Sequence, residues 1–126
     1  MTVKQPWAWL IAQGIKKVEN RSWKTNYRGT VAIHVGKSND VLNNKDVIKW
    51  IEKEGIFLPS EKQMRSQQGK IIALVQLVGI VSDSSSPWAI DGQFHWQLEN
   101  VCQIDPSIPA KGKLGLWNFP IDKVLP

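Results

Sequence analysis

The 126-residue chain is poor in the side chains that most often hold metals or attack substrates. It has a single cysteine, Cys102, so no intramolecular disulfide forms, and a lone thiol in an apolar stretch is typical of a buried core residue. Two histidines, His34 and His95, and one distant cysteine do not have the spacing of a zinc site. The chain also lacks a phosphate-cradling glycine-rich loop and a nucleophile elbow. We therefore expect no metal and no cofactor.

Long apolar runs are also scarce. The longest, "WAWLIA" and "IIALVQLVGIV", are too short or too interrupted to span a bilayer, so we expect no membrane partner. The chain does not open with a basic n-region, an apolar h-region and a small-residue cleavage site, which favours a cytoplasmic location. Its length predicts one domain, residues 1–126, that buries about two thirds of its unfolded surface.

Tryptophan and positive charge, in contrast, are abundant. The chain has seven tryptophans, and a tryptophan serves either as core or as a platform on which a nucleobase stacks. The net charge is +5, which favours a polyanionic partner without requiring one. The composition therefore raises nucleic acid as a possible partner class.

Hydrophobic periodicity predicts a curved sheet beside two or three helices. Alternation favours strands at 17–23, 30–37, 70–83, 93–104 and, with kinks, within 105–120. Helices are expected from Pro6 to Gly14, within 38–56 after a cap at Ser38, Asp40 or Asn44, and near Pro59. We expect strands 17–23 and 30–37 to form a hairpin, and strand 70–83 to be central with a bend at Gly79. The predicted class is α+β, a small β-barrel flanked by two or three helices, because closure removes exposed sheet edges.

One stretch, "GIKKVENRSWKTNYRG" at residues 14–29, combines charged and aromatic residues. A solvated loop has little use for the aromatics, and a core strand must pair every charge that it buries. In the predicted strand, Glu19, Arg21 and Trp23 share one face, with Val18 and Asn20 on the other. The stretch therefore fits neither a plain loop nor plain core.

Several motifs occur in a fixed order around this stretch. The segments "VKQPWAWLIAQGIKKVENRSWKTNYRGTVAIH", "FHWQLENV" and "IPAKGKLGLWNF" contain "QPWA", "NYRG" and "GLW". The pattern G-x-K-x-x-E-x-R is met by Gly14, Lys16, Glu19 and Arg21. Through these motifs the chain resembles, over nearly its whole length, the ASCH domain (activating signal cointegrator homology) family of the PUA-like superfold. The resemblance implies a PUA-like β-barrel with a cleft beside the first helix, lined by the hallmark charges and by aromatic residues.

The resemblance also implies candidate ligand-binding residues, namely the hallmark charges Lys16, Glu19 and Arg21 and the tryptophans inside the recognised motifs, Trp7, Trp23 and Trp117. Tyr27 and Arg28 are further candidates, because their turn could reach a phosphate or a base edge, and so is Lys111, in a basic stretch that could contact phosphate. Lys16 and Glu19 are also the candidates for catalysis, because a lysine beside a glutamate is able to act as a proton-transfer pair.

Each candidate has a purely structural alternative. The three hallmark charges also suit an ion-pair network that only fixes the strand beneath the helix. Any single tryptophan also suits the core, and we expect Trp50 to be a core residue. Tyr27 suits a turn cap, whereas Arg28 and Lys111 suit solvated positions.

The leading functional hypothesis is a module that binds RNA, a nucleobase or a nucleoside in the cleft, by stacking and by hydrogen bonds with Glu19 and Arg21. The alternative is a small hydrolase with Lys16 as a catalytic residue. Some members of the superfamily hydrolyse N4-acylated cytidine with a lysine, a threonine and a glutamate, and others have been proposed as ribonucleases. Here Glu19 stands where that threonine is expected, and Gln76 stands where the glutamate is expected. These departures favour binding over catalysis.

Overall fold

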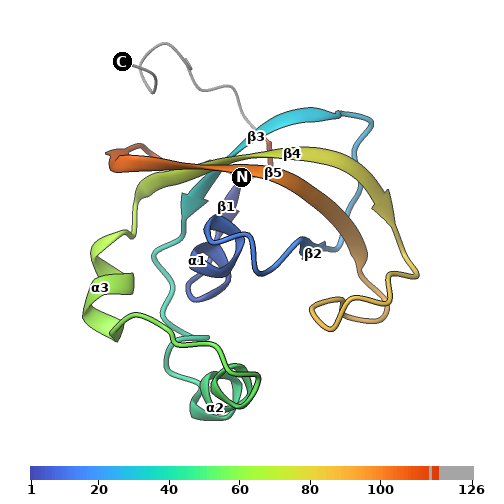
Figure 1. Cartoon of the computed structure of the whole chain (residues 1–126). Helices are drawn as coiled ribbons and strands as arrows, with labels where there is room; N and C mark the ends of the chain where they lie inside the picture. The colour runs from blue at the N-terminus through green and yellow to red at the C-terminus, as the bar shows by residue number, and fades with distance from the viewer. Residues whose placement is uncertain (114, 117–126) are drawn as a thin grey trace.

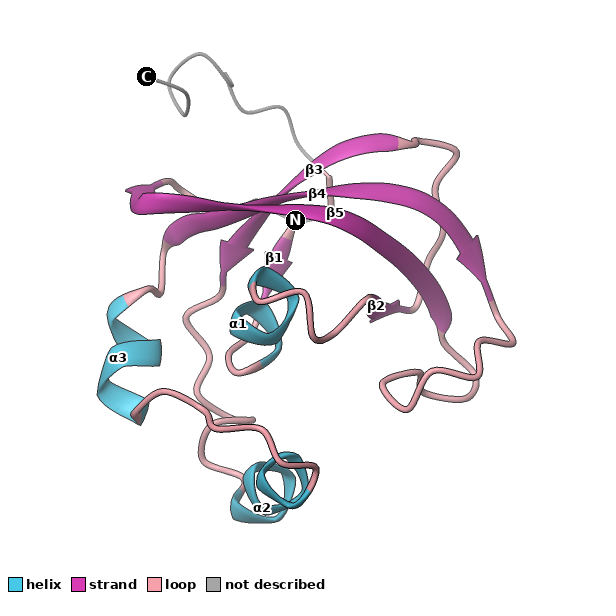
Figure 2. Ribbon diagram, in the orientation of Figure 1, coloured by secondary structure: helices cyan, strands magenta, loops and turns pink. Residues whose placement is uncertain are grey.

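The computed structural model describes residues 1–113, 115 and 116, which form an α+β fold. Its elements are β1 Thr2–Val3, α1 Trp7–Ala12, β2 Val18–Arg21, β3 Gly29–Val35, α2 Lys45–Lys53, α3 Glu61–Ser66, β4 Lys70–Val81 and β5 Phe94–Pro109. The strands make one five-stranded sheet that arches over α1, and α2 and α3 lie further out below it (Figure 1, Figure 2). The predicted α+β class is confirmed.

The sheet has the strand order β1-β3-β4-β5-β2. β1 is parallel to β3, and the other neighbouring pairs are antiparallel. β4 is central, as expected, and the β4–β5 register shifts between Leu77 and Gly79, which confirms the predicted bend. Within the described residues the sheet is open, because its two edge strands, β1 and β2, do not pair with each other. These edge strands have only two and four residues. The word barrel therefore describes it only loosely.

The predicted hairpin between the strands at 17–23 and 30–37 is wrong. β2 pairs with β5, from Val18 opposite Gln97 to Arg21 opposite Phe94, and β3 pairs with β4. The β-branched residues of β3 find apolar partners along the twelve-residue β4, whereas the short and polar β2 offers few. The segment between β2 and β3 thus connects strands that are separated in the sheet by β4 and β5.

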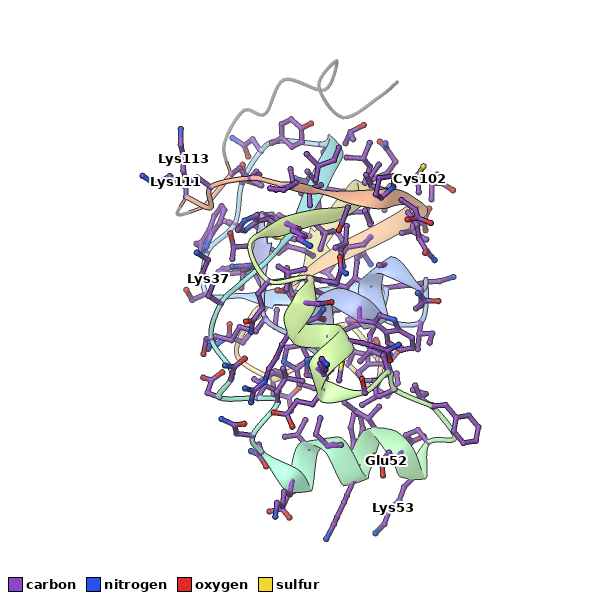
Figure 3. All side chains as sticks on the ribbon, turned by 90° about the vertical axis from the view of Figure 1, so that its left-hand side faces the viewer. Lys37, Glu52, Lys53, Cys102, Lys111 and Lys113 are labelled. Carbon is purple, nitrogen blue, oxygen red and sulfur yellow. The ribbon has the colours of Figure 1, made fainter. Side chains whose placement is uncertain are left out.

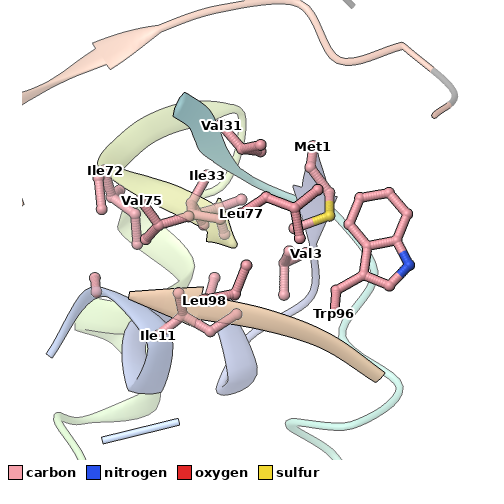
Figure 4. Packing of buried hydrophobic residues seen from close by; sticks show 14 residues of the cluster. Met1, Val3, Ile11, Val31, Ile33, Ile72, Val75, Leu77, Trp96 and Leu98 are labelled. Carbon is pink, nitrogen blue, oxygen red and sulfur yellow. The ribbon is translucent and has the colours of Figure 1, made fainter. Parts of the chain in front are cut away.

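The hydrophobic core lies between α1 and the face of the sheet that curves over it (Figure 4). α1 contributes Ala8, Ile11 and Ala12, each at most 4% exposed. The sheet contributes Val31, Ile33, Val35, Ile72, Ala73, Val75, Leu77, Trp96 and Leu98. Because burial of one large apolar side chain contributes about 1.5–3 kcal/mol, this layer holds α1 and the turn that follows it against the sheet.

Two residues predicted to be in the core are at the surface. Trp50 is 40% exposed, because α2 buries only Ile51. Cys102 is also exposed. Asn100 adopts a φ of 52°, and the β4–β5 register shifts beside it. Such a bulge reverses the alternation of inward and outward side chains, so Cys102 faces away from the core.

Helix caps agree with the sequence signals. Asn44 is the cap of α2, where its side chain accepts hydrogen bonds from two backbone amides, and Ser60 and Gln63 form a capping box at α3. The kinked strand predicted within 105–120 is in part the end of β5, which continues to Pro109. Residue 114 and residues 117–120 of that prediction lie outside the described residues.

Candidate functional site

A tight turn after α1 positions Lys16 against the sheet. Gly14 adopts a φ of 73°, in the left-handed region that favours glycine. The backbone amides of Ile15 and Lys16 then both donate to the carbonyl of Leu10, at 3.0 and 3.1 Å. The turn closes the end of the helix and leads directly into β2, so the hallmark motif is a local structure built around the end of α1.

Lys16, Glu19 and Arg21 form a continuous chain of charges. The Lys16 ammonium donates to Glu19 Oε1 at 2.9 Å and to the carbonyl of Val18 at 2.5 Å. Arg21 Nη2 lies 3.2 Å from Glu19 Oε2, so each carboxylate oxygen faces a different cation. The three side chains are 3%, 10% and 22% exposed in this order. Since a buried charge is tolerated only when it is paired, each member depends on its neighbour.

Arg21 also connects the two open edges of the sheet. It belongs to β2, and its Nη2 donates to the carbonyl of Thr2 on β1 at 2.5 Å. Its Nε is buried without a hydrogen-bond partner among the described residues. Burial, and secondly the positive charge of Arg21, lowers the pKa of the Met1 amino group to about 5. Arg21 therefore bridges the gap at which a barrel would close, with one donor not engaged by the described part of the chain.

Three tryptophans stand together beside these charges. Trp7 opens α1, Trp50 lies on α2, and Trp88 lies in the loop between β4 and β5. Trp88 packs edge-on against both, with ring centroids 6.2 Å from Trp7 and 5.3 Å from Trp50. The Lys16 ammonium lies 5.8 Å from the centroid of the Trp7 ring, within cation–π range. The edge-on contacts hold the rings without stacking them on one another.

The charges and the tryptophans line one cleft of about 400 Å³. Its remaining walls are β1, residues 87–90 and the half-exposed Lys4, which forms a salt bridge of 2.8 Å with Asp40. The cleft brings together four of the residues predicted to bind a ligand: Trp7, Lys16, Glu19 and Arg21. Their role in ligand binding stays a prediction.

Three other predicted residues lie away from the cleft. Trp23 packs edge-on against the buried Trp96, at 4.7 Å between ring centroids, and its carbonyl accepts from the Trp96 indole. The Tyr27 hydroxyl donates to the carbonyl of Thr30 at 2.6 Å. Arg28 donates to carbonyl groups of its own turn. These contacts match the structural alternatives, and a ligand-binding role for Trp23, Tyr27 and Arg28 stays a prediction.

The last two predicted residues belong to the C-terminal part of the chain. Lys111 lines a neighbouring hollow with Lys37 and Lys113, and among the described residues the lining of this hollow shares only Thr2 with the cleft. Trp117 lies outside the described residues.

Sequence reasoning missed Trp50, Trp88 and Asn20, all of which line the cleft. Asn20 holds the loop that contains Trp88: its Nδ2 donates to the Trp88 carbonyl, and its Oδ1 accepts from the Ile90 amide, both at 2.9 Å. The position of Trp88 in the polar loop "SSSPWAIDG" was a sequence signal for a role in the site, because a loop rarely needs a large aromatic side chain.

His95 supports the same loop from the core side. Its ring is 1% exposed, Nδ1 accepts from the Ser84 amide at 3.1 Å, and Nε2 lies 2.7 Å from the Ile90 carbonyl. Because an amide only donates and a carbonyl only accepts, Nε2 carries the proton. Asn20 and His95 thus tie both ends of the Trp88 segment to the sheet.

The described residues contain no group of three or more histidine, cysteine, aspartate or glutamate side chains that is suited to hold a metal ion. No helix in residues 1–113 is both long and apolar enough to cross a membrane. The cytoplasmic location and the single domain over residues 1–126 stay predictions.

Comparison with known proteins gives two findings. A family model described as the ASCH domain matches residues 1–107. Human activating signal cointegrator 1 is 54% identical over 130 aligned positions that cover 94% of this chain, and its mouse counterpart is 52% identical over the same share. The chain spans only 22% of the length of each of these relatives.

Proposed function

Since the chain belongs to the ASCH domain family, we propose that its tryptophan-lined cleft binds a nucleobase, within an RNA strand or as a free nucleoside, without catalysing a reaction on it. The observation that carries this proposal is the meeting of three tryptophans with the Lys16–Glu19–Arg21 chain in one cleft. The relatives are much longer proteins, so their own activities are not assigned to this chain.

The size and shape of the cleft suit a planar ligand. About 400 Å³ is within the range of small-molecule sites, roughly 300–1,000 Å³. Stacking of a base on an aromatic side chain contributes about 1–3 kcal/mol and requires no particular base. The tryptophans therefore supply affinity, and selectivity has to come from the polar groups.

Within the described part of the chain, Lys16 and Arg21 have N–H donors without partners, whereas each oxygen of Glu19 already has one. Both carboxylate oxygens of Glu19 already accept from Lys16 and Arg21. Lys16 has three N–H groups, of which two have partners in the structure, and Arg21 Nε has none among the described residues. The cleft therefore favours a ligand edge rich in acceptors, such as the carbonyl oxygen and unprotonated ring nitrogen of cytosine or guanine.

The hydrolase alternative rests on one observation, the buried Lys16 beside Glu19, which is a possible proton-transfer pair. Gln76, at the position where the hydrolase glutamate is expected, donates to Thr30 Oγ1 at 2.7 Å and does not line the cleft. Incubation with N4-acetylcytidine, followed by chromatography, tests this alternative. We expect no deacetylation; turnover that disappears in Lys16→Ala would reverse the ranking.

Binding is tested by a melting-temperature screen against nucleosides, since a ligand that binds only the folded state raises the apparent stability. Trp88→Ala should lose the shift, because it removes the central ring of the cleft. Trp9→Ala is the matched control: Trp9 lies on α1 but does not line the cleft. The absence of any shift with the unmodified protein, or equal losses in both variants, would contradict the proposal.

A further inference from the structure

Lys37, Lys111 and Lys113 surround a second hollow of about 560 Å³, here called the lysine hollow. Lys37 follows β3, and the other two follow β5, so the fold gathers them from distant parts of the sequence. Figure 3 shows Lys111 and Lys113 close together near one end of the molecule, with Lys37 below them on the same side. All three side chains are exposed.

The positive charge of the lysine hollow has no compensation in its lining. Among the described residues, the lining includes three lysines and neither aspartate nor glutamate. None of the three forms a salt bridge within the described residues, in contrast to Lys4 and Lys16. Like charges that converge without a counter-charge create a positive potential that attracts anions.

Three glycines, Gly36, Gly69 and Gly112, line the lysine hollow and form what is here called its floor. A Cβ atom on Gly112 would lie 2.7 Å from the His34 ring, and one on Gly36 would lie 3.2 Å from Thr2. Glycine at these two positions therefore lets the floor pack closely against His34 and β1.

His34 holds this floor in place. Its ring is 4% exposed, with Nδ1 3.0 Å from Thr2 Oγ1 and Nε2 2.8 Å from the carbonyl of Ala110. The ring therefore ties the segment that leads to Lys111 and Lys113 onto β1. These contacts fix the backbone from which Lys111 and Lys113 extend.

Thr2 connects the lysine hollow to the cleft. It lines both, and its carbonyl accepts the hydrogen bond from Arg21. The cleft and the lysine hollow are therefore neighbours that meet at β1. Building on the proposed function of the cleft, we propose that the lysine hollow binds backbone phosphates of the nucleic-acid strand whose base occupies the cleft.

The test compares two double variants that remove the same charge, K111A/K113A and K53A/K62A. Lys53 and Lys62 are exposed on α2 and α3 and line neither the cleft nor the lysine hollow, and Figure 3 shows Lys53 at the opposite end of the molecule from Lys111. A labelled single-stranded RNA oligonucleotide is titrated by fluorescence polarisation over a salt series. A free nucleoside is measured in parallel.

We expect K111A/K113A to weaken oligonucleotide binding roughly tenfold in about 0.1 M salt, and to reduce the slope of log affinity against log salt by about 0.7 per lysine. Nucleoside affinity should not change, because a nucleoside has no phosphate. Lys37→Ala, from the other wall, should give about half the change in slope. K53A/K62A should leave both ligands nearly unaffected. Equal losses in the two double variants, or an unchanged slope in K111A/K113A, would overturn the proposal.

A free phosphate ion is another source of the same chemistry. If millimolar inorganic phosphate displaces the oligonucleotide from the unmodified protein but not from K111A/K113A, and the affinity does not depend on oligonucleotide length, the lysine hollow binds a free anion and the strand proposal fails. If the oligonucleotide shows the expected lysine dependence but Trp88→Ala has no effect, the lysine hollow is supported and the function proposed for the cleft fails. If the unmodified protein binds no oligonucleotide at low salt, the lysine-hollow proposal is contradicted; if it also binds no nucleoside, the function proposed for the cleft is contradicted as well.

Discussion

The cleft and the lysine hollow both contain several positively charged side chains, but these side chains differ in burial and in salt-bridge pairing. In the cleft, Lys16 and Arg21 are largely buried and share the carboxylate of Glu19. In the lysine hollow, Lys37, Lys111 and Lys113 are exposed, and no acidic residue of the described part of the chain lines the site. Paired and buried charges fix geometry, whereas unpaired and exposed charges attract a polyanion at long range. The difference predicts that variants of the cleft change stability and selectivity, while variants of the lysine hollow change salt dependence.

The largest effect is expected where the buried chain is broken at its centre. Glu19→Gln removes the charge that both Lys16 and Arg21 face, and leaves two nearby cations without compensation. Removing one partner of a fully buried ion pair costs about 3–5 kcal/mol, and the partial exposure of Arg21 places this variant toward the lower end. Urea unfolding measures the change in the free energy of unfolding.

The matched control is Glu61→Gln, which breaks the salt bridge between Glu61 and Arg65 on α3. Both of these side chains are about half exposed, and such surface pairs contribute about 0–1 kcal/mol. A similar loss of stability in Glu19→Gln and Glu61→Gln would mean that burial does not distinguish the two pairs.

A smaller effect is expected from the loop that carries the aromatic wall. Asn20→Ala leaves the Trp88 carbonyl and the Ile90 amide without their partner, at a cost of about 1–3 kcal/mol. Because Trp88 then loses its support against Trp7 and Trp50, we expect nucleoside affinity to fall as well. Nucleoside titrations, with Asn43→Ala at an exposed site as the control, check this. Unchanged affinity despite reduced stability would show that the loop is not part of the binding site.

These residues also show what a single sequence reveals and what it hides. Lys16, Glu19 and Arg21 lie close in the chain on a turn and a strand, so their meeting was predictable from local structure. Trp50 and Trp88 reach the cleft only through the placement of α2 and of the loop after β4, which depends on contacts between distant segments. Periodicity predicts which residues form strands but not which strands pair, so the hairpin of β2 and β3 was wrong. The bulge at Asn100 likewise reversed the side on which Cys102 lies.

Arg21→Lys should have a modest effect on stability and a clearer one on binding. Lysine keeps the charge but loses the planar fork, so it cannot face Glu19 and Thr2 with the same geometry. Loss of one net hydrogen bond corresponds to about 0.5–1.5 kcal/mol in the free energy of unfolding. Nucleoside affinity should also fall, because Arg21 lines the cleft and the substitution removes its planar guanidinium fork. A large drop in melting temperature with unchanged affinity would assign Arg21 to the sheet edges alone.

The smallest effect is expected at Lys4, which lines the cleft but is paired with the exposed Asp40. The hydrogen bond from Lys4, and secondly that with Ser38, holds the pKa of Asp40 below its usual range. A lowered carboxyl pKa contributes stability above the pKa of the unfolded chain, and this contribution is lost as the pH falls through the folded value. The melting temperature of Asp40→Asn should therefore lie slightly below that of the unmodified protein at neutral pH, and the two melting temperatures should coincide in acid.

The substitution Asp40→Asn also leaves Lys4 unpaired, which makes this part of the cleft resemble the lysine hollow. If salt-bridge pairing explains the difference between the cleft and the lysine hollow, the slope of log affinity against log salt for the oligonucleotide should steepen by about 0.7. An unchanged slope would show that Lys4 does not face the bound nucleic-acid strand.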